Sequence, residues 1–184
     1  MKQLQLFTLV LFLSLVLSLS SCGFQLRGSG GDGSAGSIET TVNPIYLTVN
    51  NRYGDLHRQL QSTLADYGVE EVGRRQEAEY ALAVIAERHT RRAVATTRTI
   101  SVSEYEIRLE VEMELTNQEN KLLIPPTTLA TERIYTFDSG SLVGSGEEEA
   151  VLLEEMRADI ALQILRRVNA SVRTFEAAEH SERL

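Results

Sequence analysis

The stretch from residue 104 to residue 115 alternates strictly between charged and apolar side chains, and no other feature of the chain constrains its fold as much. The apolar set is Tyr105, Ile107, Leu109, Val111, Met113 and Leu115, and the charged set is Glu104, Glu106, Arg108, Glu110, Glu112 and Glu114. Successive side chains of a β-strand point to opposite faces. The stretch therefore predicts a long strand in a sheet with one covered face and one face in water.

The residues before this strand predict a strand followed by a helix. Residues 45–49 alternate as a short strand. Apolar residues then recur at helical spacing, at Leu56, Leu60 and Leu64. Asp55 is a candidate N-cap of this helix, and Gly68 is placed where a helix stop is expected.

Two further strands and a second helix are predicted around the alternating stretch. Residues 80–86 and 128–137 have the composition of strands. A helix is expected from about residue 145 to about residue 171, with one apolar stripe made of Leu153, Met156, Ile160, Ile164 and Val168. Residues 174–184 have no apolar stripe, and we expect them to form a disordered tail.

These elements predict a single α+β domain spanning residues 41–173. The expected order is β-α-β-β-β-α, and a chain of 184 residues is long enough for one domain. Each helix has one apolar stripe and the best strand has one apolar face. The simplest solution is a two-layer sandwich, with both helices packed on one face of a four-stranded mixed sheet.

The N-terminal residues 1–21 have the organisation of a secretory signal. Lys2 is their only charged residue, and residues 4–19 are almost entirely apolar. That run is slightly short for a transmembrane helix, which needs about 20 apolar residues. Leu19-Ser-Ser-Cys22 resembles the lipobox of bacterial lipoproteins, in which the cysteine receives a diacylglyceryl group and, after cleavage, an N-acyl chain.

Cys22 is the only cysteine in the chain. The alternative to lipidation is an ordinary secretory signal that leaves one free thiol on an exported protein, and lipidation removes that liability. Several acyl chains hold a protein firmly on a membrane. Residues 22–40 would then be the lipidated cysteine and a flexible tether, because residues 28–37 consist almost entirely of Gly and Ser. No other cofactor is expected.

The charge balance argues against a general nucleic-acid binder. The formal net charge is −8, and removing the signal takes away one base, Lys2, and no acid. Binding through counterion release needs a basic face. Any anionic ligand must therefore meet a local basic cluster. The chain has one such cluster, Arg88, Arg91, Arg92 and Arg98, in the predicted connection between the second and third strands.

No arrangement of residues indicates an enzyme. His57, His89 and His180 are the only histidines, and none pairs with another at the spacing of metal ligands. His57 is expected on the solvent side of the first helix. A G-x-S-x-G nucleophile motif is absent. Most carboxylates lie on the wet strand face or at a helix start, where they need no catalytic explanation, so we expect neither catalysis nor a metal site.

Five segments together resemble one family of envelope proteins. They are Cys22-Gly-Phe-Gln-Leu-Arg-Gly28, Ser103-Glu-Tyr-Glu106, Phe137-Asp138, Glu155-Met156 and Gln163-Ile-Leu-Arg-Arg167. Their combination, with the element order over most of residues 22–170, is similar to the lipopolysaccharide-assembly lipoproteins, the LptE (RlpB) family. The resemblance implies the same two-helix, four-stranded fold. It also implies a non-enzymatic partner that plugs the LptD outer-membrane β-barrel, helps it assemble, and binds lipopolysaccharide on its way to the outer leaflet.

The resemblance also implies a location on the periplasmic face of the outer membrane. Gly23, in place of the aspartate that retains lipoproteins in the inner membrane, favours that location. A different reading remains open, in which the chain is another outer-membrane-anchored periplasmic adaptor or a cell-wall-binding lipoprotein. A lipid-anchored hydrolase is a third reading.

The basic cluster is the candidate lipopolysaccharide site, at Arg91, Arg92 and Arg98. Guanidinium groups bind phosphates and carboxylates through paired hydrogen bonds. Similar proteins carry a basic residue linked with glycolipid binding at the position of Arg98, seven residues before Tyr105. The alternative, strongest for Arg88, is that the arginines balance the glutamates of the neighbouring strand.

The rest of the implied site departs from the family pattern or remains open. A lysine that similar proteins can carry before the last helix is missing from residues 142–146, so the basic cluster would have to hold the glycolipid largely alone or Arg133 would have to assist. Tyr135 and Phe137 are candidate contacts with the partner barrel, with burial in the core as the alternative.

Overall fold

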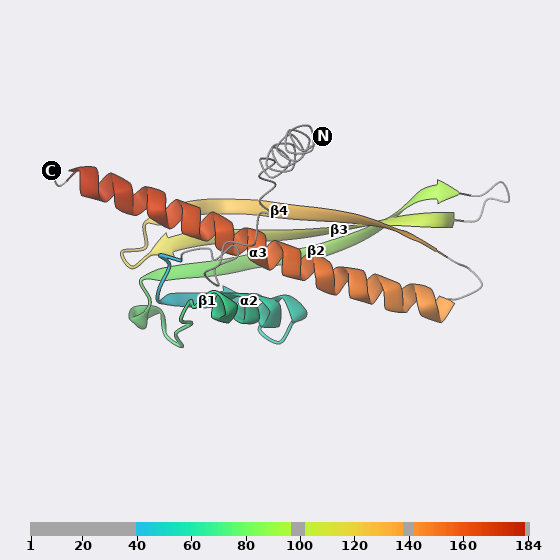
Figure 1. Cartoon of the computed structure of the whole chain (residues 1–184), viewed down its shortest axis with the longest axis horizontal. Coiled ribbons are helices and arrows are strands. Elements are labelled where there is room, and N and C mark those ends of the chain that lie inside the picture. The colour runs from blue at the N-terminus through green and yellow to red at the C-terminus, as the bar shows by residue number, and fades with distance from the viewer. Residues whose placement is uncertain (1–39, 97–101, 138–141, 183–184) are drawn as a thin grey trace, which may run out of the picture. The chain divides into compact units, whose positions relative to one another are not determined.

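The computed structural model describes residues 40–96, 102–137 and 142–182. Its elements are β1 (Ile45–Val49), α2 (Asp55–Asp66), the 3-10 turn η1 (Arg75–Glu77), β2 (Tyr80–Thr96), β3 (Val102–Asn117), β4 (Leu122–Thr136) and α3 (Leu142–Glu182). This order confirms the predicted β-α-β-β-β-α arrangement (Figure 1).

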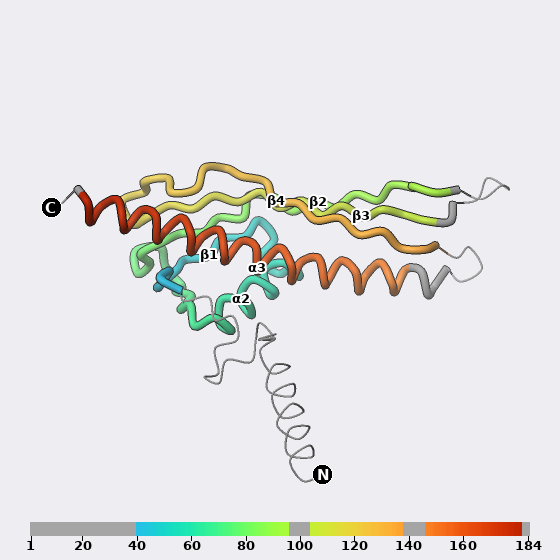
Figure 2. The backbone as a smooth tube through the Cα atoms, turned by 45° about the horizontal axis from the view of Figure 1, so that its top comes forward, coloured from blue at the N-terminus to red at the C-terminus, as the bar shows by residue number. Residues whose placement is uncertain are grey.

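The four strands form one mixed sheet in the order β1-β2-β3-β4. β1 runs parallel to β2, and the other two pairs are antiparallel. Helix α3 follows the length of the sheet in both views (Figure 1 and Figure 2), while α2 lies next to β1. The core between the helices and the sheet includes Leu60 of α2, Ile164 of α3 and Leu82 of β2. The two-layer prediction is therefore confirmed.

The strict alternation of residues 104–115 has the predicted outcome. Ile107, Leu109, Val111, Met113 and Leu115 of β3 are all fully buried. The charged residues between them lie on the other face of the sheet, which neither helix covers. They pair across the sheet with β2 and β4, as in the rows Arg88–Glu110–Ala130 and Arg92–Glu106–Ile134. We call this surface the outer face.

Strand β2 is about twice as long as predicted, because it continues past residue 86 to Thr96. Its distal half pairs with β3 along most of its length, for example at Arg88↔Glu110 and Arg92↔Glu106. The sequence did not indicate a strand here because both faces of this half carry polar side chains, so no apolar alternation marks it. Arg88, Arg91 and Arg92 therefore lie on a strand and not in a connection.

Helix α3 continues to Glu182, so the prediction of a disordered tail at residues 174–184 is wrong as far as that residue. The extension has tertiary contacts that the sequence pattern did not reveal. Val172 is fully buried. Lys121 Nζ lies 4.6 Å from the centre of the Phe175 ring, and the Tyr80 hydroxyl donates a hydrogen bond of 3.1 Å to Glu176.

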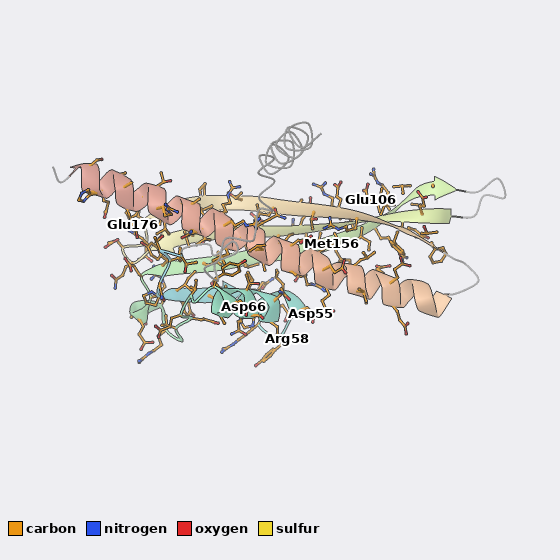
Figure 3. The ribbon with its side chains drawn as sticks, in the orientation of Figure 1. Asp55, Arg58, Asp66, Glu106, Met156 and Glu176 are labelled. Carbon is orange, nitrogen blue, oxygen red and sulfur yellow. The ribbon has the colours of Figure 1, made fainter. Side chains whose placement is uncertain are left out.

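The ends of the helices differ in detail from the predictions. The N-cap of α2 is Gly54, and Asp55 is the first helical residue, where it pairs with Arg58 (Figure 3). Gly68 has a φ of 72° and ends α2 as predicted, since glycine adopts this conformation without strain. Helix α3 begins at Leu142, three residues before the predicted start.

The predicted signal peptide, Cys22 and most of the predicted tether lie outside the described residues, so those predictions stay predictions. In the part of the chain that the structure describes, no helix is both long and apolar enough to cross a membrane.

Two isoleucines on neighbouring strands, the buried Ile107 of β3 and the exposed Ile134 of β4, give a test of the layer arrangement. We expect Ile107→Ala, at a fully buried position, to lower the free energy of unfolding by roughly 2–5 kcal/mol, because it leaves a cavity. Ile134→Ala is the matched control, since its side chain is 62% exposed on the outer face; its effect should stay within about 0.5 kcal/mol. Urea unfolding followed by circular dichroism measures both, and similar losses in the two variants would contradict the arrangement.

Candidate functional site

A bulge in β2 decides which of its basic residues faces the helices, because neighbouring strand residues point to opposite faces and the bulge reverses this alternation. The register with β3 shifts between Val84 and Ala86. Before the shift, Val84 faces the helices. After it, Arg91 pairs with the buried Ile107 and faces the helices, whereas Arg92 pairs with Glu106 on the outer face.

Arg91 belongs to a polar and aromatic cluster on the helix side of the sheet. Its Nη1 donates a hydrogen bond of 2.8 Å to Glu149 of α3, and its guanidinium lies 4.6 Å from the centre of the Tyr105 ring. The Tyr135 hydroxyl donates to the same Glu149 oxygen at 2.9 Å. The ring of Tyr105 stacks on Tyr135 at 5.9 Å and meets the edge of Phe137 at 5.2 Å. We call these five residues the Arg91 cluster.

The two charged neighbours of Tyr135 act on its hydroxyl in opposite directions. Burial, followed by the hydrogen bond to Glu149, raises the pKa of the Tyr135 phenol, while Arg91 lowers it. The raising effects dominate, so the hydroxyl keeps its proton near neutral pH and remains a donor. The cluster thus ties β2, β3 and β4 to the first half of α3 through one carboxylate.

The arginines of the outer face are paired with the glutamates of β3. Arg92 forms an ion pair of 2.9 Å with Glu106, and Arg88 lies 3.9 Å from Glu112. The charge balance suggested for Arg88 is therefore present, and it extends to Arg92. Both arginine side chains are still about two-thirds exposed or more, at 67% and 71%. Exposed pairs of this kind are worth at most about 1 kcal/mol, so an anionic ligand could displace the carboxylates.

The structure places the remaining predicted site residues as follows. Arg98 lies outside the described residues. Arg133 faces the helices and pairs with Asp159 of α3, away from the outer-face arginines. Tyr135 is only 4% exposed, whereas Phe137 is partly exposed. Their predicted contact with a partner stays a prediction, and Phe137 has more surface available for it.

Sequence reasoning missed a second charged tie between α3 and the other elements. Arg157 Nε donates a hydrogen bond of 2.7 Å to Glu87 of β2, and its Nη1 lies 3.3 Å from Asp55 of α2. The Arg157 side chain is only 15% exposed. No spacing in the sequence relates these three residues, because each comes from a different element.

Two further observations concern the histidine His57 and the possible ligands of a metal ion. His57 is 9% exposed and not on the solvent side as expected; it lines a cavity of about 170 Å³ beside β1. Within residues 40–96, 102–137 and 142–182 there is no group of three or more His, Cys, Asp or Glu side chains that could hold a metal ion. What the described site offers is arginine donors, carboxylates and aromatic rings, an arrangement suited to binding.

The family model of the lipopolysaccharide-assembly proteins, LptE, matches residues 42–168, which is more than half of the chain. The chain belongs to the LptE family. This confirms the resemblance seen in the sequence and gives the chain a role in lipopolysaccharide assembly. No curated protein matches the chain.

Three solved structures share the LptE-type fold. Rare lipoprotein B from Shewanella oneidensis has a TM-score of 0.66 at 23% identity, covering 73% of this chain and 99% of its own. Lipoprotein B from Nitrosomonas europaea has a TM-score of 0.66 at 23% identity, with coverages of 86% and 96%. A minor lipoprotein from Acinetobacter baumannii has a TM-score of 0.58 at 24% identity, with coverages of 69% and 90%. At these identities the likeness shows the fold alone.

Arg157 forms a largely buried ion pair and Arg92 an exposed one, and this difference gives a testable prediction. Arg157→Ala should lower the free energy of unfolding by roughly 1.5–3 kcal/mol, because it leaves Glu87, a partly buried carboxylate, without its charged donor. Arg92→Ala, which breaks an exposed pair, should lower it by less than about 1 kcal/mol. Urea unfolding of both variants checks this, and a larger loss for Arg92→Ala would show that the assignment of structural and available arginines is reversed.

Proposed function

We propose that this chain is a lipid-anchored, non-enzymatic partner of the LptD β-barrel that plugs the barrel, assists its assembly and helps deliver lipopolysaccharide to the outer leaflet. The observation that carries the proposal is the LptE family match over residues 42–168. The fold adds support, because α3 and the three long strands form a structure whose outer face is polar. A polar face suits the lumen of an outer-membrane barrel, whose inner wall is also polar.

The anchor of this proposal is Cys22. Acyl chains on this cysteine would hold the protein on the periplasmic face of the outer membrane, the location that Gly23 favours. The described domain begins at residue 40, which leaves 22–39 as the link to the anchor. A plug of this kind needs no catalytic residues, since its work is binding and positioning.

The proposed lipopolysaccharide site is centred on Arg92 and Arg98, with Arg91 in support. Arg92 is the described arginine of this set with the most exposed side chain, and its partner Glu106 holds it only through a surface ion pair. A phosphate group could replace that carboxylate and form paired, charge-assisted hydrogen bonds. Arg91 is already engaged by Glu149 and Tyr105 on the helix side of the sheet, so it would bind an anionic group only by giving up its pair with Glu149.

The proposed contact with the barrel wall is at the distal end of β4. Phe137 is partly exposed, and the outward-facing Ile134 is 62% exposed. Aromatic and large apolar side chains with exposed surface are the usual anchors of protein interfaces. Tyr135 would act there by holding β4 against α3, since its ring is buried and its hydroxyl is bound to Glu149.

Co-purification tests the partnership. After gentle detergent extraction from native membranes, the mature protein should be recovered in a complex with a large β-barrel, with both chains present in comparable amounts. Recovery of the protein only as a free monomer would overturn the proposal. Retention on purified sacculi in place of a barrel would favour the cell-wall-binding alternative.

Charge reversal tests the glycolipid site. Arg92→Glu and Arg98→Glu should each weaken lipopolysaccharide binding by roughly tenfold or more, since a charge-assisted hydrogen bond is worth about 1.5–3 kcal/mol. Arg74→Glu is the matched control, because Arg74 is equally exposed, at 76%, and also pairs with a glutamate, but it lies near η1. With the fold intact by circular dichroism, equal binding by all three variants would remove the arginine site.

A further inference from the structure

A groove lies between the start of β4 and the C-terminal half of α3. Its volume of about 570 Å³ falls within the range of small-molecule sites, roughly 300–1,000 Å³. Much of its lining is apolar, including Leu122, Leu123, Ala170 and Phe175. Leu122 is 48% exposed and adds apolar surface to this lining.

Two cations lie at this groove, in a protein of net charge −8. They are Lys121, whose Nζ stands over the Phe175 ring, and Arg167 of α3. Neither has an ion pair with a carboxylate in the part of the chain that the structure describes, unlike Arg88, Arg91 and Arg92. Among the described residues their charges are therefore not balanced by a direct ion pair, which leaves them available to an anionic group.

The groove is lined by the same turn of α3 that binds Thr41, near the beginning of the described domain. The backbone N–H and the hydroxyl of Thr41 both donate to Asn169 Oδ1, at 3.0 and 3.2 Å. Asn169 is two residues from Arg167 and next to Ala170 in the sequence, and both of these line the groove. Seventeen residues lie between Cys22 and Thr40, and a Gly/Ser-type coil of that length would span roughly 23 Å. An anchor at Cys22 thus keeps this part of α3 near the membrane surface.

The groove is separate from the arginine site. Figure 3 shows Glu106, the partner of Arg92, and Glu176, one residue beyond Phe175, toward opposite ends of α3 and the sheet. The two sites also differ in chemistry. The arginines stand on a polar strand face, whereas Lys121 and Arg167 flank an apolar floor on which a hydrocarbon chain can lie.

We propose that this groove binds one acyl chain and the phosphate of an anionic phospholipid from the leaflet that holds the anchor. The inference rests on the proposed function only for the acylation of Cys22. Lys121 and Arg167 contact the phosphate, as juxtamembrane basic residues contact anionic headgroups, and Leu122 and Phe175 contact the chain. Bound in this way, the domain turns its C-terminal end toward the leaflet and its arginine site away from it.

A single labelled thiol can test this contact in the full acylated chain. Leu122→Cys introduces the only free thiol, because Cys22 is the sole native cysteine and is acylated. Labelled with nitrobenzoxadiazole and placed in phosphatidylglycerol-containing vesicles, this position should be quenched strongly by lipids brominated on the acyl chain. The same label at Ile134→Cys, which is exposed on the outer face, should be quenched several-fold less.

Charge reversal identifies the role of the two cations. Lys121→Glu together with Arg167→Glu should reduce the quenching at position 122 several-fold. Arg166→Glu together with Arg173→Glu is the matched control, with the same change of charge on exposed residues of α3 that do not line the groove, and should leave quenching unchanged.

Each outcome has a definite meaning. Weak quenching at position 122, or equal effects of the two charge reversals, overturns the lipid inference while the LptD proposal stands. Labelling of the native chain at Cys22 would show that the anchor is missing and would remove the premise. Quenching as expected, without recovery of a barrel, would keep the groove and reject the partnership.

Discussion

The packing of α3 along the helix-facing side of the sheet is the interaction on which the rest of the structure depends. Met156, Ile160 and Ile164 of the helix and Ile107 and Leu109 of β3 are all at most 1% exposed. Burying one such side chain contributes roughly 1.5–3 kcal/mol. Without this contact, the distal halves of β2, β3 and β4 would form a ribbon with both faces in water, and such ribbons are marginally stable by themselves.

Charged ties extend this contact beyond the apolar core. Glu149, Asp159 and Arg157 of α3 bind Arg91, Arg133 and Glu87 of the sheet, respectively. In these pairs, charged side chains of the sheet that face α3 are already bound by charged side chains of the helix. On the outer face, Arg88 and Arg92 keep 67% and 71% of their side-chain surface exposed, against 46% for the helix-facing Arg91. The same packing therefore separates a structural set of arginines from a set available to ligands.

The fold could be predicted from the sequence wherever one face was apolar and the other polar. The alternation at residues 104–115 and the stripe from Met156 to Val168 gave the layer arrangement, and Gly68 gave a helix end. The distal half of β2 was missed because its two faces are both polar. The helix beyond residue 174 was missed because Phe175 and Glu176 are held by single contacts, with Lys121 and Tyr80, that leave no repeating pattern.

The candidate site could be predicted only in part, because features without a repeating sequence pattern determine it. Arg91 and Arg92 stood out in the sequence, and as neighbours on a strand they face opposite sides of the sheet. The bulge after Val84 decides that Arg91 is the one that faces the helices, and a bulge has no signal in composition. No pattern in the sequence singled out Glu149 as a partner of these residues. Its bonds to Arg91 and Tyr135 depend on α3 meeting the strands, which spacing along the chain does not encode.

The central proposal is that the outer-face arginine region meets lipopolysaccharide and a barrel partner. The most direct measurement is photocrosslinking in intact cells, with a photoreactive amino acid in place of Arg92 and, as a control, in place of Arg74. The account predicts adducts with lipopolysaccharide and with a large outer-membrane β-barrel from position 92, and far fewer from position 74. Equal adducts from both positions, or adducts from position 92 with neither of these partners, would contradict it.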